Sequence, residues 1–391
     1  MGQWIRWTSL LAGLVLAACA SESIEPHPAE ATPPSSEPHG EQVPHDNPCD
    51  EENGGCGDPA LWTCESLDLG LVACHDVNEC DVLHGGCDPL VDCENQEGAP
   101  ALCGPCPEGY VGSGYAGCTE RMVCEGDAVV ATEAELASYR SCHVITGDLS
   151  VLSTNLTTID LPSLQSIEGS LFVSDNAELQ SLAGLSSLGA VGMHIKITDN
   201  PMLHNLDGLD DITEVPGELY VMNNPSLVHI EGLSKLSHVL GRLLKVGSNA
   251  TLEDLEGLRS LQYVGGALSI WGNPQITSLM GLDSLASIGT GEHEAKNLEL
   301  NFNASLISLD ALSALHTVPG DLQVAGNNIL PSLEGLHNLT SVGGGFVVIN
   351  NPALPSCEVD ALLERIASEG GIAGGIQDDG NSGDESCHDA D

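Results

Sequence analysis

Apolar residues return at fixed intervals over roughly the last two thirds of the 391-residue chain. Each interval opens with valine or isoleucine, and most intervals are 24 residues long. The nine units begin at Val144, Ile167, Val191, Val215, Val239, Val264, Ile288, Val318 and Val342. A repeat of this length is the signature of a solenoid, in which each unit forms one coil and buries its apolar face against its neighbours.

One short strand is predicted in each coil. In the unit "VPGELYVMNNPSLVHIEGLSKLSH", residues 215–238, Leu219 and Val221 alternate with Glu218, Tyr220 and Met222. Alternation of apolar and polar positions is the pattern of a half-buried strand. We therefore expect a mainly β fold, a right-handed β-solenoid with a single strand per coil and an aliphatic core.

An asparagine, often followed by proline, comes shortly after each predicted strand. This column holds Asn176, Asn200, Asn224, Asn249, Asn273, Asn303, Asn327 and Asn351. A chain that turns inward leaves backbone groups without strand partners, and such groups must be satisfied when they are buried. Because an asparagine amide both donates and accepts, a stack of these side chains is predicted to bridge successive coils.

The segment 49–118 has a different character, since it carries ten of the 15 cysteines. Small loop-rich segments of this kind depend on disulfides. Without Cys19 the chain has 14 cysteines, an even number, as expected for an exported and oxidised protein. Spacing alone leaves 15 possible connectivities for the six cysteines from Cys80 to Cys118.

These six cysteines, together with "CGPCPEGYVGSGYAGC", resemble an EGF-like module, here placed at residues 76–118. Residues 49–75 resemble an EGF-like module that lacks its final cysteine pair. The two resemblances imply disulfides Cys49–Cys64, Cys56–Cys74, Cys80–Cys93, Cys87–Cys103 and Cys106–Cys118.

"DVNEC", residues 76–80, is similar to the calcium-binding EGF signature. The resemblance implies a Ca²⁺ ion held by the carboxylates of Asp76 and Glu79, the backbone carbonyl of Val77 and the side chain of Asn95. Hard oxygen ligands suit Ca²⁺, which would stiffen the junction between the two modules. The alternative is that Asp76 and Glu79 are two more charges in an acidic chain.

The repeat itself resembles the receptor L-domain family. Its coils read "V-x-G-x-L-x-V" where ordinary leucine-rich repeats have a first leucine, and residues 123–151 resemble the start of an L domain. The resemblance covers residues 123 to about 357 and implies disulfide caps Cys124–Cys142 and Cys357–Cys387 at the two ends of the solenoid, which we place at 119–391. It also implies a general capacity to bind a macromolecule.

The N-terminus, "MGQWIRWTSLLAGLVLAAC", predicts an export signal over residues 1–18. Its apolar run is too short to span a bilayer. The end of the run resembles a bacterial lipobox, which implies cleavage before Cys19, lipid on Cys19 and, from Ala20, sorting to the outer membrane. The alternative is an ordinary cleaved signal peptide with a stray cysteine. Residues 19–48 are rich in Pro, Glu, Ser and His, so we expect a disordered tether.

Charge and motifs exclude several classes of function. Lys and Arg total 10 against 57 Asp and Glu, for a net charge of −47. Such a surface repels phosphate backbones, so nucleic acid is not an expected partner. No nucleophile elbow, zinc-protease, P-loop or dinucleotide motif appears, so we expect no enzyme. The solenoid histidines are predicted to be solvated turn residues: His194, His204, His229, His238, His293, His316 and His337.

Outward strand positions are where a solenoid would bind a partner. One outward column holds Phe172, Lys196, Tyr220, Ser269, Glu299, Gln323 and Val347, and the next holds Ser174, Thr198, Met222, Gly247, Trp271, Asn301, Ala325 and Ile349. Aromatic residues make up only 3% of the chain, yet three of them occur here, and aromatics dominate binding hot spots. The predicted ligand face is therefore Phe172, Tyr220, Met222 and Trp271. The alternative is that outward β positions favour aromatics for sheet packing alone.

A six-residue insertion near 289–296 is either a recognition loop or a tolerated bulge. Taken together, the sequence predicts a lipid-anchored protein of the bacterial cell envelope that binds or adheres to an extracellular or envelope protein or polysaccharide. The alternative is a rigid spacer that organises the envelope and has no specific ligand.

Overall fold

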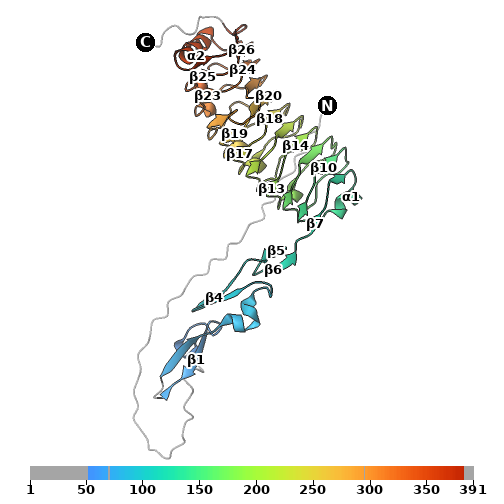
Figure 1. The fold of residues 1–391 in the computed structure, drawn as a ribbon, viewed down its shortest axis with the longest axis vertical. Helices are drawn as coiled ribbons and strands as arrows, with labels where there is room; N and C mark the ends of the chain where they lie inside the picture. The colour runs from blue at the N-terminus through green and yellow to red at the C-terminus, as the bar shows by residue number, and fades with distance from the viewer. Residues whose placement is uncertain (1–51, 69–70, 295, 383–391) are drawn as a thin grey trace, which may run out of the picture. The chain divides into compact units, whose positions relative to one another are not determined.

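The computed structural model describes residues 52–68, 71–294 and 296–382 (Figure 1). These residues fall into two compact units, 52–78 with 96–100 and 79–95 with 101–382. The predicted signal, the tether, Cys19, Cys49 and Cys387 lie outside the described residues. Within the described ranges no helix has the length and apolar character needed to cross a membrane.

The first unit is held by a disulfide-linked hairpin. It contains the 3-10 helix η1 (Glu52–Gly55) and the antiparallel strands β1 (Trp62–Ser66) and β2 (Val72–Asp76). Cys56 pairs with Cys74, with 5.4 Å between their Cα atoms, and Cys64 is also disulfide-bonded. Among the described residues of this unit, Cys56 is the one buried apolar residue, so cross-links rather than a core order the chain.

The cysteine-rich start of the second unit is built from short elements. They are η3 (Glu79–Asp81), η4 (Leu83–Gly86), the hairpin of β3 (Cys93–Gln96) and β4 (Ala99–Cys103), whose tip belongs to the first unit, and the hairpin of β5 (Tyr110–Ser113) and β6 (Gly117–Glu120). Its disulfides are Cys80–Cys93, Cys87–Cys103 and Cys106–Cys118. These pairs, like Cys56–Cys74, are the ones that the EGF-like resemblance implies.

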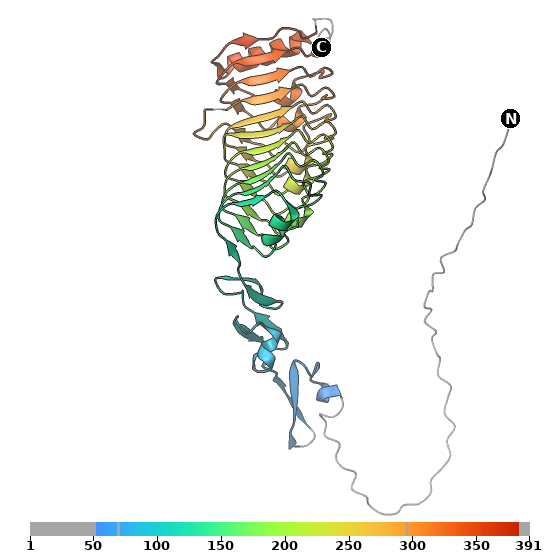
Figure 2. The same cartoon turned by 90° about the vertical axis from the view of Figure 1, so that its right-hand side faces the viewer.

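From residue 123 the chain forms the predicted solenoid, whose coils stack around one long parallel sheet (Figure 2). Its eleven strands are β8 (Ala128–Val130), β10 (Leu149–Leu152), β12 (Leu171–Ser174), β14 (Ile195–Thr198), β16 (Leu219–Met222), β18 (Leu243–Gly247), β20 (Ala267–Trp271), β22 (Leu298–Asn301), β24 (Leu322–Ala325), β26 (Phe346–Ile349) and β28 (Ile376–Gln377). Nine come from the nine repeats and one is added at each end.

Each coil also carries a second, two-residue strand, which the prediction of a single strand per coil omitted. These strands are β7 (Val123–Cys124), β9 (Val144–Ile145), β11 (Ser166–Ile167), β13 (Ala190–Val191), β15 (Glu214–Val215), β17 (His238–Val239), β19 (Tyr263–Val264), β21 (Ser287–Ile288), β23 (Thr317–Val318), β25 (Ser341–Val342) and β27 (Gly371–Ile372). They form three separate sheets, with breaks between β13 and β15 and between β21 and β23.

Proline explains both breaks. In unbroken stretches the residue after the short strand donates its N–H to the previous coil, as Gly192 does to the carbonyl of Ile167 at 2.8 Å. Pro216 and Pro319 occupy this position at the two breaks. Since proline has no N–H, the ladder cannot continue there.

The asparagine column forms the predicted ladder, and all eight side chains are fully buried. Oδ1 of Asn200 accepts from the backbone N–H of Asn176 at 3.3 Å and from Nδ2 of Asn176 at 3.0 Å. Nδ2 of Asn200 donates to the carbonyl of Val173 at 3.0 Å. The backbone N–H of Asn200 in turn donates to Oδ1 of Asn224 at 3.0 Å, so each ladder asparagine links three successive coils, and the ladder ends on Thr154 and Asn381.

The core is a continuous aliphatic cluster that runs from Ala128 to Ile366. At its start, the helix α1 (Glu133–Ser138) buries Leu136, and the Cys124–Cys142 disulfide forms as the L-domain resemblance implies. At its end, α2 (Ser356–Ser368) buries Val359, Leu362 and Ile366 against the last coil. Both ends of the stack are therefore covered, which a solenoid needs for solubility.

Candidate ligand-binding face

The register of the long sheet places the outward columns as predicted. Phe172 lies opposite Lys196, Lys196 opposite Tyr220, and Met222 opposite Gly247. The column also contains Lys245, between Tyr220 and Ser269, which the sequence prediction omitted. Phe172, Tyr220, Met222 and Trp271 are all half-buried.

Two lysines lie over two aromatic rings on this face. Lys196 Nζ is 4.7 Å from the centroid of the Tyr220 ring, and Lys245 Nζ is 5.1 Å from the ring of Trp271. Both distances fall within the range of cation–π attraction. Arg242 is linked to Lys196 through Glu218, and Lys245 lies opposite Tyr220 on the next strand, so three of the chain's ten Lys and Arg residues lie on this face. We call Lys196, Glu218, Tyr220, Arg242, Lys245 and Trp271 the basic–aromatic patch.

Glu218 orders the basic side chains of the patch. Its carboxylate is only 10% exposed and lies 3.3 Å from Lys196 Nζ and 2.9 Å from Arg242 Nε. Burial alone raises the pKa of Glu218, but hydrogen bonds from Arg242 and Lys196 outweigh it and hold the pKa below its usual value. Burial, and then the Glu218 charge, raise the pKa of Tyr220. Glu218 is therefore ionised at neutral pH and fixes both cations.

Gly247 makes room for Trp271. A Cβ atom at Gly247 would lie 2.2 Å from Nε1 of Trp271, so the indole covers bare backbone on the neighbouring strand. Nε1 is buried and has no hydrogen-bond partner. Trp271 thus packs on the sheet as well as facing outward, as the packing alternative predicts for this residue.

The insertion at 289–296 folds back on earlier coils. The ring of His293 lies 3.0 Å, through Nε2, from the carbonyl of Leu240, and the N–H of Gly291 donates to Gly265 at 2.8 Å. The insertion is therefore held to the solenoid at the residues that follow β17 and β19. Ser269 was predicted to face outward, but only 1% of it is exposed, so it adds nothing to a ligand face.

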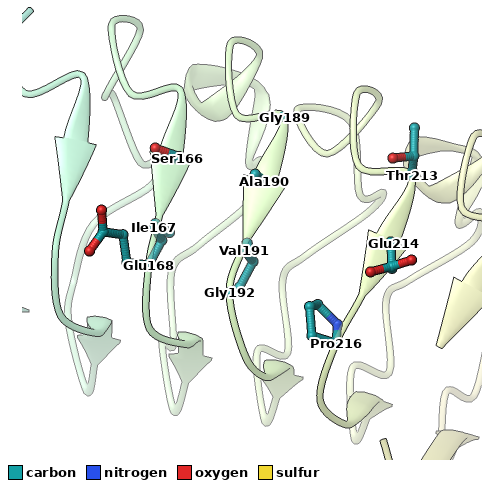
Figure 3. A pocket seen from close by; sticks show the side chains of 10 residues that line it. All are labelled: Ser166, Ile167, Glu168, Gly189, Ala190, Val191, Gly192, Thr213, Glu214 and Pro216. Atoms are coloured by element: carbon teal, nitrogen blue, oxygen red, sulfur yellow. The ribbon is translucent and has the colours of Figure 1, made fainter. Parts of the chain in front are cut away.

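A separate cavity of about 450 Å³ opens where the short sheet is broken, beside β11, β13 and β15 (Figure 3). It is lined by Ser166, Ile167, Glu168, Gly189, Ala190, Val191, Gly192, Thr213, Glu214 and Pro216. The lining residues include two carboxylates and no cation, histidine or cysteine. Its chemistry therefore opposes an anionic ligand and provides no positive group to orient one.

The residues predicted to hold calcium belong to two units. In the first, Asp76 Oδ1 accepts from the N–H of Gly98 at 2.7 Å. In the second, the N–H of Glu79 donates to Asn95 Oδ1 at 3.2 Å, which brings these two predicted ligands together. Both carboxylate oxygens of Glu79 are buried and have no hydrogen-bond partner. Because a buried carboxylate without a donor is costly, and oxygen donors suit Ca²⁺, Glu79 and Asn95 within the second unit fit the ion.

The fold and the face define a solenoid binding module of receptor L-domain type. Residues 141–240 match the family model of the receptor L domain, so the chain contains a receptor L domain within its solenoid. The chain is also similar to cubilin from the dog, Canis lupus familiaris, at 42% identity over 67 residues. That match covers 17% of this chain and 2% of cubilin, so it spans a small fraction of the curated relative.

Proposed function

We propose that the protein is a non-catalytic binding and adhesion module that contacts its ligand through the basic–aromatic patch. The observation that carries this proposal is the pair of lysine–aromatic contacts, with Lys196 and Arg242 held by Glu218, in a chain with a net charge of −47. Aromatic and arginine side chains dominate hot spots, and the patch combines both. A surface that served only as a spacer would have no need for an ordered cluster of cations.

The chemistry of the patch favours an anionic ligand at the cell envelope. Lys196, Arg242 and Lys245 supply positive charge, while Tyr220 and Trp271 supply flat apolar surface. An acidic polysaccharide satisfies both, because its carboxylates pair with the cations and its sugar rings lie against the aromatic rings. The remaining anionic surface of the protein repels such a polymer, which confines it to the patch.

The test is capture of ligand from an envelope extract by the immobilised full chain. Tyr220→Ala and Trp271→Ala should each weaken binding at least about tenfold. The melting temperature should fall only by about 2–4 °C, with Trp271→Ala the larger because its indole packs on Gly247. Met280→Ala is the matched control, since Met280 is 51% exposed and lies outside the long sheet.

The results separate the alternatives. Unchanged capture by both aromatic variants would remove the patch as the ligand site. Cooperative unfolding of both variants at a much lower temperature would show that these rings are packing residues. Failure of the wild-type chain to capture anything would favour the rigid spacer. Loss of the captured material after glycosidase but not protease treatment would identify it as polysaccharide.

Anchoring through Cys19 is the second part of the proposal, supported by the lipobox resemblance. A lipid anchor at the outer membrane would hold the binding module at the envelope by a tether at residues 19–48. Cys19→Ser should release the protein from membranes into the soluble fraction. Detergent-dependent membrane partitioning of that variant would refute the anchor.

Calcium is the third part, supported by the unpartnered carboxylate of Glu79 beside Asn95. Titration of the full chain with Ca²⁺ should give a saturable heat in the range of about 10⁻⁴–10⁻³ M, typical of extracellular modules. Asp76→Ala and Asn95→Ala should each remove most of this heat. Asp81→Ala, a nearby acidic residue outside the predicted set, should retain it. Equal heats in all four proteins would exclude the site.

A further inference from the structure

His229 stands at a position of the repeat that in other coils holds a side chain capping the 3-10 turn. In six coils, the side chain two positions before the first residue of the 3-10 turn, or of the equivalent bend, accepts a hydrogen bond from the backbone N–H of that first residue. These residues are Ser181, Asn205, Asp254, Ser278, Ser308 and Ser332, at 3.0–3.4 Å. His229 occupies this column in the intervening coil, where the turn is η6 (Glu231–Leu233).

His229 does not accept that bond. Its Nδ1 atom is buried from solvent, and no hydrogen-bond donor or acceptor reaches it. The prediction of a solvated turn histidine is therefore wrong for Nδ1, although 43% of the side chain as a whole is exposed. A buried polar atom without a partner is costly, so the position calls for a ligand.

Two carboxylates from adjacent coils surround this nitrogen. His229 Nδ1 is 3.7 Å from Glu231 Oε1 and 3.7 Å from Asp254 Oδ2. The three atoms all lie within 4.8 Å of one another. Asp254 uses its other oxygen, Oδ1, to accept the N–H of Glu256 at 3.0 Å, which fixes the carboxylate so that Oδ2 faces the histidine.

The separations favour a shared ion over direct contact. At 3.7 Å, nitrogen and oxygen are too far apart for a hydrogen bond. Ligands around a tetrahedral ion with bonds of about 2.0–2.1 Å lie roughly 3.3–3.5 Å apart, so small side-chain rotations bring these three atoms into range. One neutral imidazole and two carboxylates also balance the charge of a divalent cation.

We propose that His229, Glu231 and Asp254 bind one divalent transition-metal ion of the Zn²⁺ class. Imidazole nitrogen favours such ions over Ca²⁺ and Mg²⁺, which prefer oxygen alone. The side chains are 43%, 45% and 28% exposed, so the ion enters from solvent and water completes its coordination. Because the ligands come from two coils, the ion cross-links the stack on the side of the 3-10 turns.

The test compares Zn²⁺ binding by chelator-treated full chain and three variants, by equilibrium dialysis and by melting temperature. His229→Gln removes the nitrogen. Asp254→Asn keeps the turn bond, as Asn205 does in an earlier coil, but removes the charge. His316→Gln is the control, because His316 Nδ1 already contacts the carbonyl of Ala314 at 2.9 Å.

Wild type and His316→Gln should bind one more equivalent of Zn²⁺ than His229→Gln and Asp254→Asn at micromolar ion. Saturation with Zn²⁺ should raise the melting temperature of wild type and His316→Gln by about 2–5 °C and leave that of His229→Gln and Asp254→Asn unchanged. An anomalous scattering peak at His229 Nδ1 in Zn²⁺-soaked crystals would locate the ion and separate it from weak binding by His27, His39 and His45. Equal stoichiometry and equal melting shifts in all four proteins, or a peak elsewhere, would overturn the site.

Discussion

The solenoid and the cysteine-rich modules are stabilised by different interactions. Between Ala128 and Ile366 the solenoid buries a continuous aliphatic core whose members are almost all fully inaccessible. In the described part of 52–118 the buried apolar side chains are Cys56, Cys87, Val91 and Ala101, and two of these are half-cystines. Stacking therefore makes a rigid, extended face on which a ligand patch can be built, whereas covalent links make small modules suited to a stalk.

The largest expected effect comes from reduction. A native disulfide in a small module contributes about 2–5 kcal/mol, so mild reductant and alkylation should unfold residues 52–118. The central coils, from β12 to β26, contain no cysteine and should keep their protection. Hydrogen exchange with mass spectrometry measures both regions in one sample. Equal loss of protection in the two regions would show that the comparison is false.

Within the solenoid, the asparagine ladder should be strongest at its middle. Asn273→Ala leaves the backbone N–H of Asn249 buried without a partner and removes the side-chain bond to the carbonyl of Val246. We expect a loss of about 3–5 kcal/mol in unfolding free energy. Asn381→Ala, at the half-buried end of the ladder, should lose only about 1 kcal/mol. Urea denaturation of both variants measures the contrast, and equal losses would mean that position in the stack is irrelevant.

A smaller effect is expected at the patch. Its partners raise the ionised fraction of Glu218 in the folded state, so the folded pKa lies below the unfolded one. The stabilisation is therefore present above the ordinary glutamate range, about 4.3, and is lost as pH falls through the lower folded pKa. Since Arg242 is 62% exposed, Glu218→Gln should cost only about 1 kcal/mol at pH 7.

The Glu218→Gln difference should vanish in acid. Its matched control is Glu214→Gln, an exposed glutamate for which the structure gives no ion pair in the described part of the chain. Urea unfolding at pH 7 and at a series of lower pH values, down to the most acidic at which the protein still folds, measures the difference between the two variants. A cost of Glu218→Gln that persists at the lowest pH would contradict the ion-pair account.

The repeating parts of the fold could be predicted from the sequence, because the same pattern of apolar residues and asparagine recurs in every coil. Nine copies of one pattern set the strand, the register and the buried asparagine column, so the outward position of Tyr220 and Trp271 followed directly. The pairing of cysteines came from resemblance, since their spacing alone left alternatives open. The predicted pairs Cys49–Cys64 and Cys357–Cys387 reach beyond the described residues, although Cys64 and Cys357 are disulfide-bonded.

The features that could not be predicted depend on single residues that depart from the repeat. The break of the short sheet requires the missing N–H of Pro216, a detail invisible in a hydrophobic period. The residue before each ladder asparagine takes positive φ, and Phe302 does so at 59°, where the other coils have Gly or a small polar residue such as Asp175. His229 was one of seven solenoid histidines that looked alike in the sequence, and only the next coil brings Asp254 to it. Lys245 could have been found by filling the one gap in the outward column.

The central claim is that the basic–aromatic patch acts as one recognition unit. A double-mutant cycle of Lys245→Ala and Trp271→Ala tests it most directly, with affinity for the anionic polysaccharide fraction of the envelope as the measured quantity. Each single change should raise the dissociation constant about tenfold, and the double change should be less than additive by about 1 kcal/mol. Lys235→Ala, a cation paired with Asp211 away from the long sheet, should leave the affinity unchanged. Equal losses for Lys235→Ala and Lys245→Ala, or strictly additive effects within the pair, would contradict the account.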